Sequence, residues 1–228
     1  MFERFEKIIG SNSLDKIKKT TVMVIGIGGV GGYAVEALIR SGIEKIIIID
    51  SDIVDITNKN RQIIALDSTI GKKKVVVMKE RILDINKNCE VIDLNLFLDT
   101  SNTENIINKY KPGYIIDACD TIATKKEIIT SCLKYNVKFI SCMGTGNKLD
   151  PTRLKIDDIR KTSYDPLCKI IRKWVKDEKI KNKIPVLWSD EKPIETKDRV
   201  PGSSSFVPSS AGLIIASYII NNIIKTSD

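Results

Sequence analysis

The sequence contains no Cys-x-x-Cys pair, and this absence excludes one class of metal site at the outset. The five cysteines are odd in number and widely spaced: Cys89, Cys119, Cys132, Cys142 and Cys168. A structural zinc site built from paired cysteines is therefore excluded, and no zinc is expected. Cys119, Cys132 and Cys142 lie in or beside apolar stretches and are expected to be small core residues. Cys168 lies in a basic stretch that could lower its pKa, although an ordinary helix cysteine is the alternative.

The chain also lacks a hydrophobic run of the length that a membrane span needs. The longest run, residues 211–220, is short of the roughly 20 apolar residues that a span requires. Residues 2–7 are rich in charge and do not resemble a secretory signal. Repeats and low-complexity segments are absent as well. These absences predict a cytoplasmic protein without membrane contact.

The composition is that of a folded protein with an uneven surplus of basic residues. Of the 228 residues, 42% are hydrophobic and 29% are charged, and the net charge is +8. Residues 151–200 hold 14 Lys and Arg against 9 Asp and Glu. Such a basic segment could bind nucleic acid or another polyanion, although a solvated surface of a lysine-rich chain is the alternative.

Apolar runs of strand type alternate with helical stretches over residues 20–145. The runs are 22–25, 46–49, 91–94, 114–116 and 137–140, and the helices are expected over 29–40, 73–85, 102–109 and 124–135. Continuous apolar runs are typical of strands buried on both faces of a parallel sheet. The alternation therefore predicts an α/β fold with a doubly wound, mostly parallel sheet of the Rossmann type.

The regular alternation of strands and helices ends after residue 145. Residues 146–228 are therefore predicted to form a basic α+β extension, packed on the domain formed by residues 1–145. Short strands are expected over 153–156 and 185–189, and a basic amphipathic helix over 166–179. Residues 191–205 are rich in proline, glycine and serine and are expected to form a mobile loop. The final helix, about 208–224, is apolar on most sides and should pack against the sheet or a second subunit.

A glycine-rich loop follows the first strand directly. Gly26, Gly28 and Gly31 fit the pattern G-x-G-x-x-G, with Gly29 between them, and this loop lets a backbone approach phosphates at a helix N-terminus. Asp50 ends the next apolar run, about 20 residues further on, where an acid that binds a ribose hydroxyl is expected. Taken alone, these features also fit an NAD-dependent dehydrogenase.

Polar residues beyond Asp50 favour a triphosphate site instead. Asp52, Asn58, Arg61 and Gln62 follow the second strand, at the edge of the sheet where ligands bind. Arg61 offers a planar fork to a phosphate, and Lys74 adds a point charge, although a solvated helix start is the alternative for Lys74. No structural reason is expected for Asn58 and Arg61 at these positions.

Two acids follow the fourth strand. Asp117 and Asp120 could hold Mg²⁺, which prefers a few carboxylates together with phosphate oxygens. Asp120 could also cap the helix expected over 124–135. Two cations and two acids around a glycine loop indicate a site for a nucleoside triphosphate. A dehydrogenase binds a pyrophosphate that is not cleaved, so it needs neither magnesium ligands nor a clamp of positive charges.

Five blocks, in order, resemble the adenylation domain of the ubiquitin-activating-enzyme superfamily, which includes bacterial thiamine- and molybdopterin-pathway adenylyltransferases. The blocks are 26–31, 50–52, 58–62, 71–74 and 117–120. The resemblance implies that Asp50 binds the ribose of ATP, and that Asn58, Arg61 and Lys74 contact the phosphates. It implies also that Asp120 positions Mg²⁺ near the α-phosphate. The full ATP-binding set that it implies is Gly26, Gly28, Gly29, Gly31, Asp50, Asp52, Asn58, Arg61, Gln62, Lys74 and Asp120.

Further blocks in the second half resemble the tRNA threonylcarbamoyladenosine dehydratase family. They are 141–152, 159–162, 165–167, 189–193 and 202–209. The resemblance implies ATP-dependent dehydration of N6-threonylcarbamoyladenosine at position 37 of tRNA, through adenylation of its carboxylate. Arg61, Lys74 and Asp120 are then the expected catalytic residues. An adenylyltransferase for a small sulfur-carrier protein is the main alternative, and the missing Cys-x-x-Cys pairs argue against it.

The expected partners are tRNA and, because the superfamily commonly dimerises, a second copy of the chain. Charge alone suggests the residues that hold the tRNA phosphates. They are Arg160, Lys161, Lys169, Arg172, Lys173 and Lys176. The sequence leaves open a monovalent cation, a partner from a cysteine-desulfurase system, and a non-catalytic nucleic-acid-binding role, against which Asn58, Arg61, Lys74 and Asp120 count.

Overall fold

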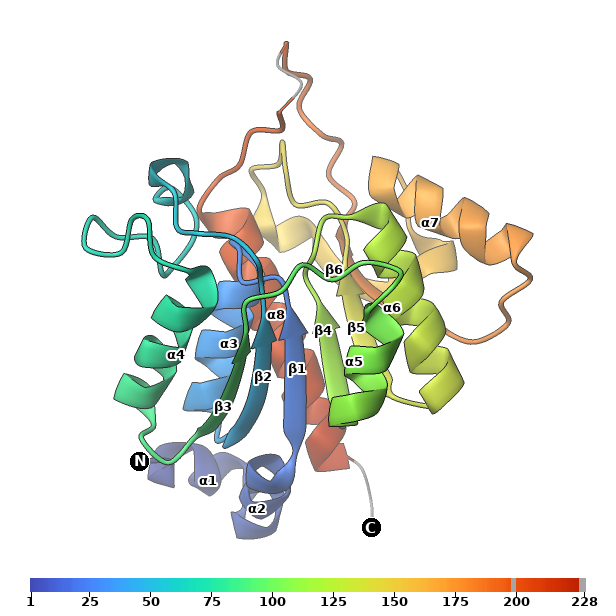
Figure 1. Ribbon diagram of the computed structural model, residues 1–228. Helices are drawn as coiled ribbons and strands as arrows, with labels where there is room; N and C mark the ends of the chain where they lie inside the picture. Colours follow the sequence, from blue (N-terminus) through green and yellow to red (C-terminus); the bar gives the residue numbers. More distant parts are fainter. Residues whose placement is uncertain (198–199, 226–228) are drawn as a thin grey trace.

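A seven-stranded sheet runs through the molecule and has helices on both faces (Figure 1). The computed structural model describes residues 1–197 and 200–225. The strands are β1 (Thr21–Ile25), β2 (Lys45–Ile49), β3 (Glu90–Leu94), β4 (Tyr114–Asp117), β5 (Lys138–Cys142), β6 (Leu154–Asp158) and β7 (Pro185–Ser189). Their order is β3-β2-β1-β4-β5-β7-β6, and only β6 runs antiparallel to its neighbour. The predicted α/β fold with a mostly parallel sheet is confirmed.

The six helices that the sequence analysis predicts are present, with ends shifted by at most two residues, and two further helices precede β1. They are α1 (Glu3–Ile9), α2 (Ser11–Lys19), α3 (Gly31–Arg40), α4 (Lys74–Ile85), α5 (Thr103–Tyr110), α6 (Ile122–Tyr135), α7 (Pro166–Asp177) and α8 (Phe206–Lys225). Three short 3₁₀ helices are η1 (Ile56–Asn58), η2 (Pro151–Arg153) and η3 (Ile159–Lys161). The second half does not form a separate layer, because β7 and β6 extend the same sheet beyond β5.

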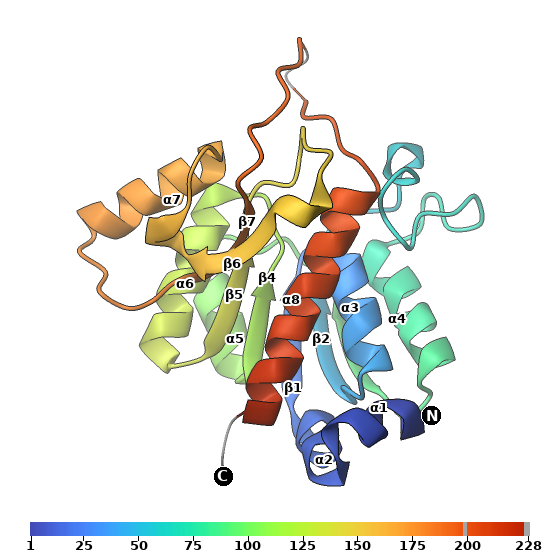
Figure 2. The same cartoon turned by 180° about the vertical axis from the view of Figure 1, so that it is seen from behind.

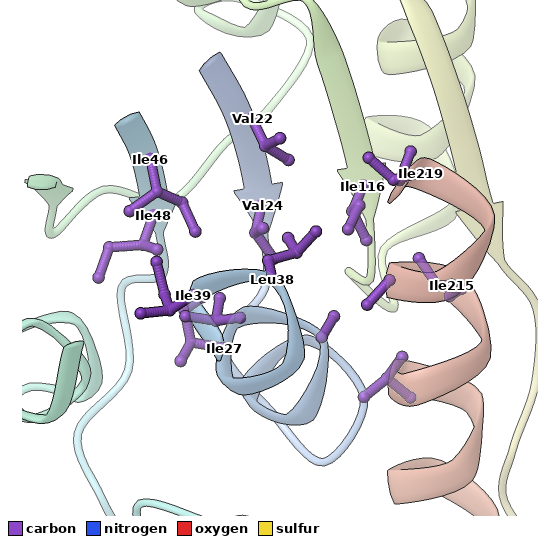
Figure 3. Close-up of a cluster of buried hydrophobic side chains, with 14 of the residues drawn as sticks. Val22, Val24, Ile27, Leu38, Ile39, Ile46, Ile48, Ile116, Ile215 and Ile219 are labelled. Atoms are coloured by element: carbon purple, nitrogen blue, oxygen red, sulfur yellow. The ribbon is translucent and has the colours of Figure 1, made fainter. Parts of the chain in front are cut away.

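The central strands are buried on both faces, which explains their unbroken apolar runs. On one face, branched side chains of β1, β2 and β4 pack against α3 and α8 (Figure 3). Val24, Ile48 and Ile116 contribute from the sheet, and Leu38 and Ile215 from the helices. The helices α5, α6 and α7 cover the other face, around a second cluster.

The last helix, α8, crosses the back of the sheet beside α3 (Figure 2). Its length and composition would suffice for a membrane span, which the run 211–220 did not suggest. Half of the apolar window is buried inside the protein, as in the core helix of a soluble protein. Packing on the sheet therefore explains why α8 is so apolar.

The strand order places a crevice at one end of the sheet. Chain connections run from β1 toward β2 and β3 on one side, and from β4 toward β5 and β7 on the other. In open α/β sheets, ligands bind at this switch point, outside the carboxyl ends of the strands. The glycine loop follows β1, Asp50 follows β2 and Asp120 follows β4, so all three reach the crevice.

Candidate nucleotide site

A cavity of about 310 Å³ opens at the switch point. Ten of the eleven residues that the sequence analysis assigned to ATP line it: Gly26, Gly28, Gly29, Asp50, Asp52, Asn58, Arg61, Gln62, Lys74 and Asp120. They come from five separate segments of the chain, which the fold brings to one edge of the sheet. Gly31 does not line the cavity.

Gly31, together with Gly26, allows the tight turn between β1 and α3. Gly26 has φ of 89°, and a Cβ there would lie 2.7 Å from the carbonyl oxygen of Ala118. A Cβ at Gly31 would lie 1.8 Å from the carbonyl oxygen of Gly26. Only glycine fits at either position. The turn directs the N-terminus of α3, with its unpaired N–H groups and positive dipole end, toward the cavity.

Asp50 fixes the glycine loop to the end of β2. One carboxylate oxygen accepts a hydrogen bond from the Ile27 N–H at 2.7 Å, and the other accepts one from the Asp52 N–H at 2.8 Å. The side chain of Asp52 in turn forms an ion pair with Lys74 Nζ at 2.7 Å. Lys74 is buried at the start of α4, so the solvated helix start considered for it is wrong.

Asn58 has a structural role that the sequence analysis did not expect. Its Oδ1 accepts a hydrogen bond from the Asp55 N–H at 3.1 Å and closes a capping box around η1. Arg61 uses a single nitrogen, Nη1, for its hydrogen bonds within the described residues, to the Thr57 carbonyl and the Asn60 side chain. Its other donors are available to a ligand. Gln62 Oε1 is buried without a hydrogen-bond partner in the described part of the chain.

The two acids at the end of β4 have different roles. The expectation that both of them bind Mg²⁺ is wrong. Asp117 is fully buried and forms an ion pair with the buried Lys125 at 3.0 Å, so it cannot reach the cavity. Asp120 is exposed and lines the cavity. It does not cap α6 either, because that helix begins after Thr121 without a side-chain cap. Asp120 is thus left available for a metal.

The buried ion pair lies at the end of β4, directly before the residues 118–121 that line this part of the cavity. Asp117 accepts hydrogen bonds from Lys125, from the Ser141 hydroxyl and from the Cys119 N–H. Burial alone would lower the pKa of Lys125, but the charge of Asp117 raises it above its ordinary value. Lys125 therefore stays charged, and its contacts with Asp117 fix the end of β4 from which Asp120 extends.

An apolar wall of the cavity was missed by the sequence analysis. Leu96, Phe97 and Leu98 line it from the connection between β3 and α5. Phe97 is 56% exposed, and the buried Thr124 hydroxyl holds the Leu98 carbonyl at 2.8 Å. Apolar residues that continue past the end of β3 were the available signal. A flat base can pack against such a wall.

Hydrogen bonds connect residues 194, 202 and 203 to two other parts of the chain, at Asn147 and Asn60. The Asn147 carbonyl accepts a hydrogen bond from the Ile194 N–H. The Asn147 N–H donates to the Gly202 carbonyl at 2.8 Å, and Asn147 Oδ1 accepts from the Gly202 N–H at 2.6 Å. Asn60 Nδ2 donates to the Ser203 carbonyl at 2.9 Å. Asn60 thereby links this segment to Arg61, whose guanidinium it also contacts. The expected mobility of residues 191–205 stays a prediction.

The basic residues assigned to tRNA gather around α7. Five of them, all but Lys161, line a hollow of about 720 Å³: Arg160, Lys169, Arg172, Lys173 and Lys176. The guanidinium groups have structural partners, because Arg160 contacts Asp158 and Arg172 contacts Thr162. The three lysines share one face of α7 at spacings of four and three residues and remain exposed.

The thiols are protonated and inert at neutral pH. Burial raises the pKa of Cys168 and Cys142 to about 12 each. The low pKa considered for Cys168 is therefore wrong. Within the described residues, no group of three or more His, Cys, Asp and Glu side chains is arranged to hold a metal ion.

The crevice thus offers a glycine turn, a helix N-terminus and two cations to a nucleoside phosphate, in a nucleotide-binding α/β protein of the Rossmann type. The model of the ThiF family matches residues 3–225. The chain belongs to the ThiF family.

Several proteins and solved structures with an assigned activity are similar to this chain. A tRNA threonylcarbamoyladenosine dehydratase of Bacillus subtilis (strain 168) is 44% identical over 241 residues, which cover 98% of this chain and 94% of the relative. The crystal structure of Escherichia coli tRNA N6-threonylcarbamoyladenosine dehydratase, TcdA, in complex with ATP matches with a TM-score of 0.92 at 31% identity, over 98% of this chain and 93% of that one. A probable molybdopterin-synthase adenylyltransferase of Porphyra purpurea is 38% identical over only 54% of this chain and 31% of its own length. The resemblance found in the sequence is confirmed.

Proposed function

We propose that the chain catalyses the ATP-dependent dehydration of N6-threonylcarbamoyladenosine at position 37 of tRNA and so forms its cyclic derivative. The observation that carries the proposal is the extent of the similarity. The dehydratase relative and the ATP-bound dehydratase structure match 98% of the chain, including the basic second half. The molybdopterin-pathway relative matches only 54%. Similarity to the dehydratases thus extends over almost the whole chain, whereas similarity to the molybdopterin-pathway relative covers about half of it.

The chemistry needs an activated carboxylate. A carboxylate oxygen of the substrate attacks the α-phosphorus of ATP, the bond to the β-phosphate oxygen breaks, and pyrophosphate leaves. The carbamoyl group of the same nucleoside then attacks the activated carbonyl, loses a proton and displaces AMP. The elements of one water are removed while ATP becomes AMP and pyrophosphate. Ring closure is intramolecular and therefore has a large effective-concentration advantage.

The site residues stabilise charge and fix geometry. We assign Arg61 and Lys74 to the phosphates, where fixed cations stabilise the charge that develops during transfer. The ammonium of Lys74 has three donors, so a phosphate can share it with Asp52. Asp50 is assigned to the ribose, and Asn58 and Gln62 complete the polar wall. The adenine is placed against the apolar side chains of residues 96–98.

A magnesium ion fits this site through Asp120. The carboxylate of Asp120 is exposed, lines the cavity and has no ion-pair partner in the described part of the chain. Asp52 and Asp117 are engaged with lysines. Mg²⁺ commonly uses one or two carboxylates together with phosphate oxygens and waters, so one acid suffices. When bound, it would neutralise phosphate charge.

Mass spectrometry of nucleosides from tRNA incubated with protein and ATP tests the activity. We expect a product that is lighter by one water than N6-threonylcarbamoyladenosine, and it should require ATP. Absence of this product would sink the proposal. ATP–pyrophosphate exchange that depends on a carrier protein ending in Gly-Gly, with no tRNA product, would favour the sulfur-carrier reaction instead.

Single substitutions test the residue roles. Asp120→Asn should lower kcat/KM by about 100-fold or more, as expected for the loss of one charge-stabilising group. Asp67→Asn is the matched control, because Asp67 is an exposed acid that pairs with Lys59 away from the cavity. Arg61→Ala should abolish turnover, with Arg61→Lys partly restoring it. Full activity in Asp120→Asn or Arg61→Ala would remove that residue from the mechanism.

We place the tRNA on the exposed lysines of α7, Lys169, Lys173 and Lys176, with Lys161 nearby. Arg160 and Arg172 are assigned a supporting role because their guanidinium groups already hold the surrounding backbone. Neutralising the three helix lysines should weaken tRNA binding and reduce its salt dependence, since each phosphate contact adds about one to the slope. Unchanged tRNA affinity in that variant would contradict the placement.

We still expect a homodimer in the cytoplasm. Because α8 packs in the core of the protein, we expect the contact between the two subunits on another surface. Apolar side chains are exposed along the connection between β2 and α4: Ile53, Ile56, Leu66 and Ile70. Such patches mark interaction sites. Light scattering should report a dimer, and Ile56→Glu combined with Leu66→Glu should give a monomer. A monomeric wild type would contradict the expectation. The cysteine-desulfurase partner and the monovalent cation stay predictions.

A further inference from the structure

A row of lysines marks the end of the sheet opposite the nucleotide cavity. Lys19 precedes β1, Lys111 precedes β4, Lys138 begins β5 and Lys183 precedes β7. These four strands are neighbours in the sheet and run parallel to one another. Their amino ends therefore lie side by side along one edge, about 4.8 Å apart from strand to strand. We call Lys19, Lys111, Lys138 and Lys183 the lysine row.

The strand register aligns the row in two pairs. Val22 of β1 pairs with Tyr114 of β4, and Lys19 and Lys111 each stand three residues before that pair. Ser141 of β5 pairs with Val186 of β7, and Lys138 and Lys183 again stand three residues before it. Lys19 ends α2 and Lys111 follows α5, so these two lie outside the paired strands, and their proximity is shown by the hollow that both line.

The row lines two adjoining hollows. Lys16, Lys19, Lys111 and Lys138 line the larger one, of about 990 Å³. Lys138 and Lys183 line the second, of about 250 Å³, and the two share the segment 136–138 and Tyr114. Among residues 1–197 and 200–225, no Asp or Glu side chain lines either hollow. The positive charge is thus concentrated in a continuous concave surface.

Acids balance the lysines elsewhere along this edge. Lys45 at the start of β2 pairs with Glu90, and Lys18 of α2 pairs with Glu44. By contrast, Lys19, Lys111 and Lys183 form no ion pair with any residue between 1 and 197 or 200 and 225. The charges of Lys19, Lys111 and Lys183 are therefore available to a ligand.

The loop after α7 connects the row to the proposed tRNA surface. Lys179 and Lys181 line the hollow beside α7, and Lys183, two residues further on, lines the hollow at β7. The loop of residues 178–184 leads from α7 to the amino end of β7 (Figure 2), and Lys179, Lys181 and Lys183 lie on it. A track of this kind suits a long polyanion better than a small anion.

We propose that the lysine row binds the phosphate backbone of the same tRNA, at a part outside the anticodon arm. The proposal rests on the proposed function. Nucleotide cavity and row lie at opposite ends of strands of five residues, about 17 Å long at 3.3 Å per residue. When a nucleotide of the anticodon loop lies at the cavity, the lysine row is close to a more distant region of the RNA. Lysines give phosphate contacts without sequence preference.

The test compares two RNAs and two variants. Lys19→Gln, Lys111→Gln and Lys183→Gln are combined in one protein, and Lys7→Gln, Lys45→Gln and Lys87→Gln in a matched control. Both lose three charges, and all six side chains are exposed. The RNAs are a full-length tRNA and its isolated anticodon arm, titrated at several salt concentrations. The melting temperature and ATP affinity of each variant check that it is folded.

We expect the row variant to bind full-length tRNA at least tenfold more weakly than the control variant does at about 0.1 M salt. The slope of log affinity against log salt should fall by about two to three. Binding of the anticodon arm should match that of the control.

Equal affinity and slope for full-length tRNA in both variants would overturn the proposal and leave an acidic protein as the candidate occupant of the row. An equal loss for the isolated anticodon arm would overturn it as well, because the row would then lie near the anticodon. Failure of the proposed function is seen separately, as absence of the dehydrated nucleoside with wild-type protein, and these binding comparisons do not depend on turnover.

Discussion

Replacement of Lys125 by methionine tests how the buried ion pair beneath the nucleotide cavity stabilises the fold. Both side chains are fully buried, and Lys125 Nζ lies 3.0 and 3.1 Å from the two carboxylate oxygens of Asp117. Methionine is similar in size and lacks the charge, so the carboxylate keeps the Ser141 hydroxyl and the N–H and thiol of Cys119 as partners but no cation. We expect the free energy of unfolding to fall by about 3–5 kcal/mol, the range for removing one partner of a buried pair.

Urea unfolding of the wild type, Lys125→Met, Asp117→Asn and the double variant measures this effect. The double variant leaves no uncompensated charge, so its loss should be smaller than the sum of the two single losses by about 2 kcal/mol. Lys134→Met, taken from an exposed ion pair with Glu104, is the control and should change stability little. A loss below about 1 kcal/mol for Lys125→Met, or additive single losses, would refute the reasoning.

Three further outcomes are expected. The pKa of Cys168, raised to about 12 by burial, stabilises the fold below the ordinary thiol pKa of about 8.5 and less so as pH rises toward 12. Cys168→Ala should therefore flatten the fall in unfolding free energy between pH 9 and 11, by up to about 1.4 kcal/mol per pH unit; an unchanged slope contradicts this. Asn147 has φ of 57°, so Asn147→Gly should keep more stability than Asn147→Ala, while both expose the chain near Gly202 to limited proteolysis. Asp50→Asn can accept only one of the two backbone hydrogen bonds, from Ile27 or from Asp52, and should bind ATP at least tenfold more weakly by calorimetry; equal binding would contradict its role.

Local patterns were sufficient for the fold and for most of the nucleotide cavity. Apolar runs predicted β1, β2, β4 and β5, because strands buried on both faces must be apolar throughout. The glycine loop and Asp50 were found from their spacing, since both follow directly on a strand. Arg61 and Lys74 were found because polar side chains after a buried strand reach the carboxyl edge of the sheet.

Pairing between distant residues could not be predicted in this way. Asp117 and Asp120 look alike in the sequence, yet one is buried against Lys125 and the other is exposed. Which acid faces the cavity depends on the path of the chain after β4. The same holds for Asn60, whose contact with Ser203 joins segments that are far apart along the chain.

The sequence by itself determined the order of strands and helices, the glycine turn and the charges available to a nucleotide, because each follows from the period and chemistry of neighbouring residues. Tertiary structure alone decided which charges meet. Tertiary packing brought five segments into one cavity, paired Asp117 with Lys125 away from solvent, and gathered the lysine row at the opposite edge. The physical reason is that the register of a sheet places residues from distant parts of the chain within a few ångströms of one another.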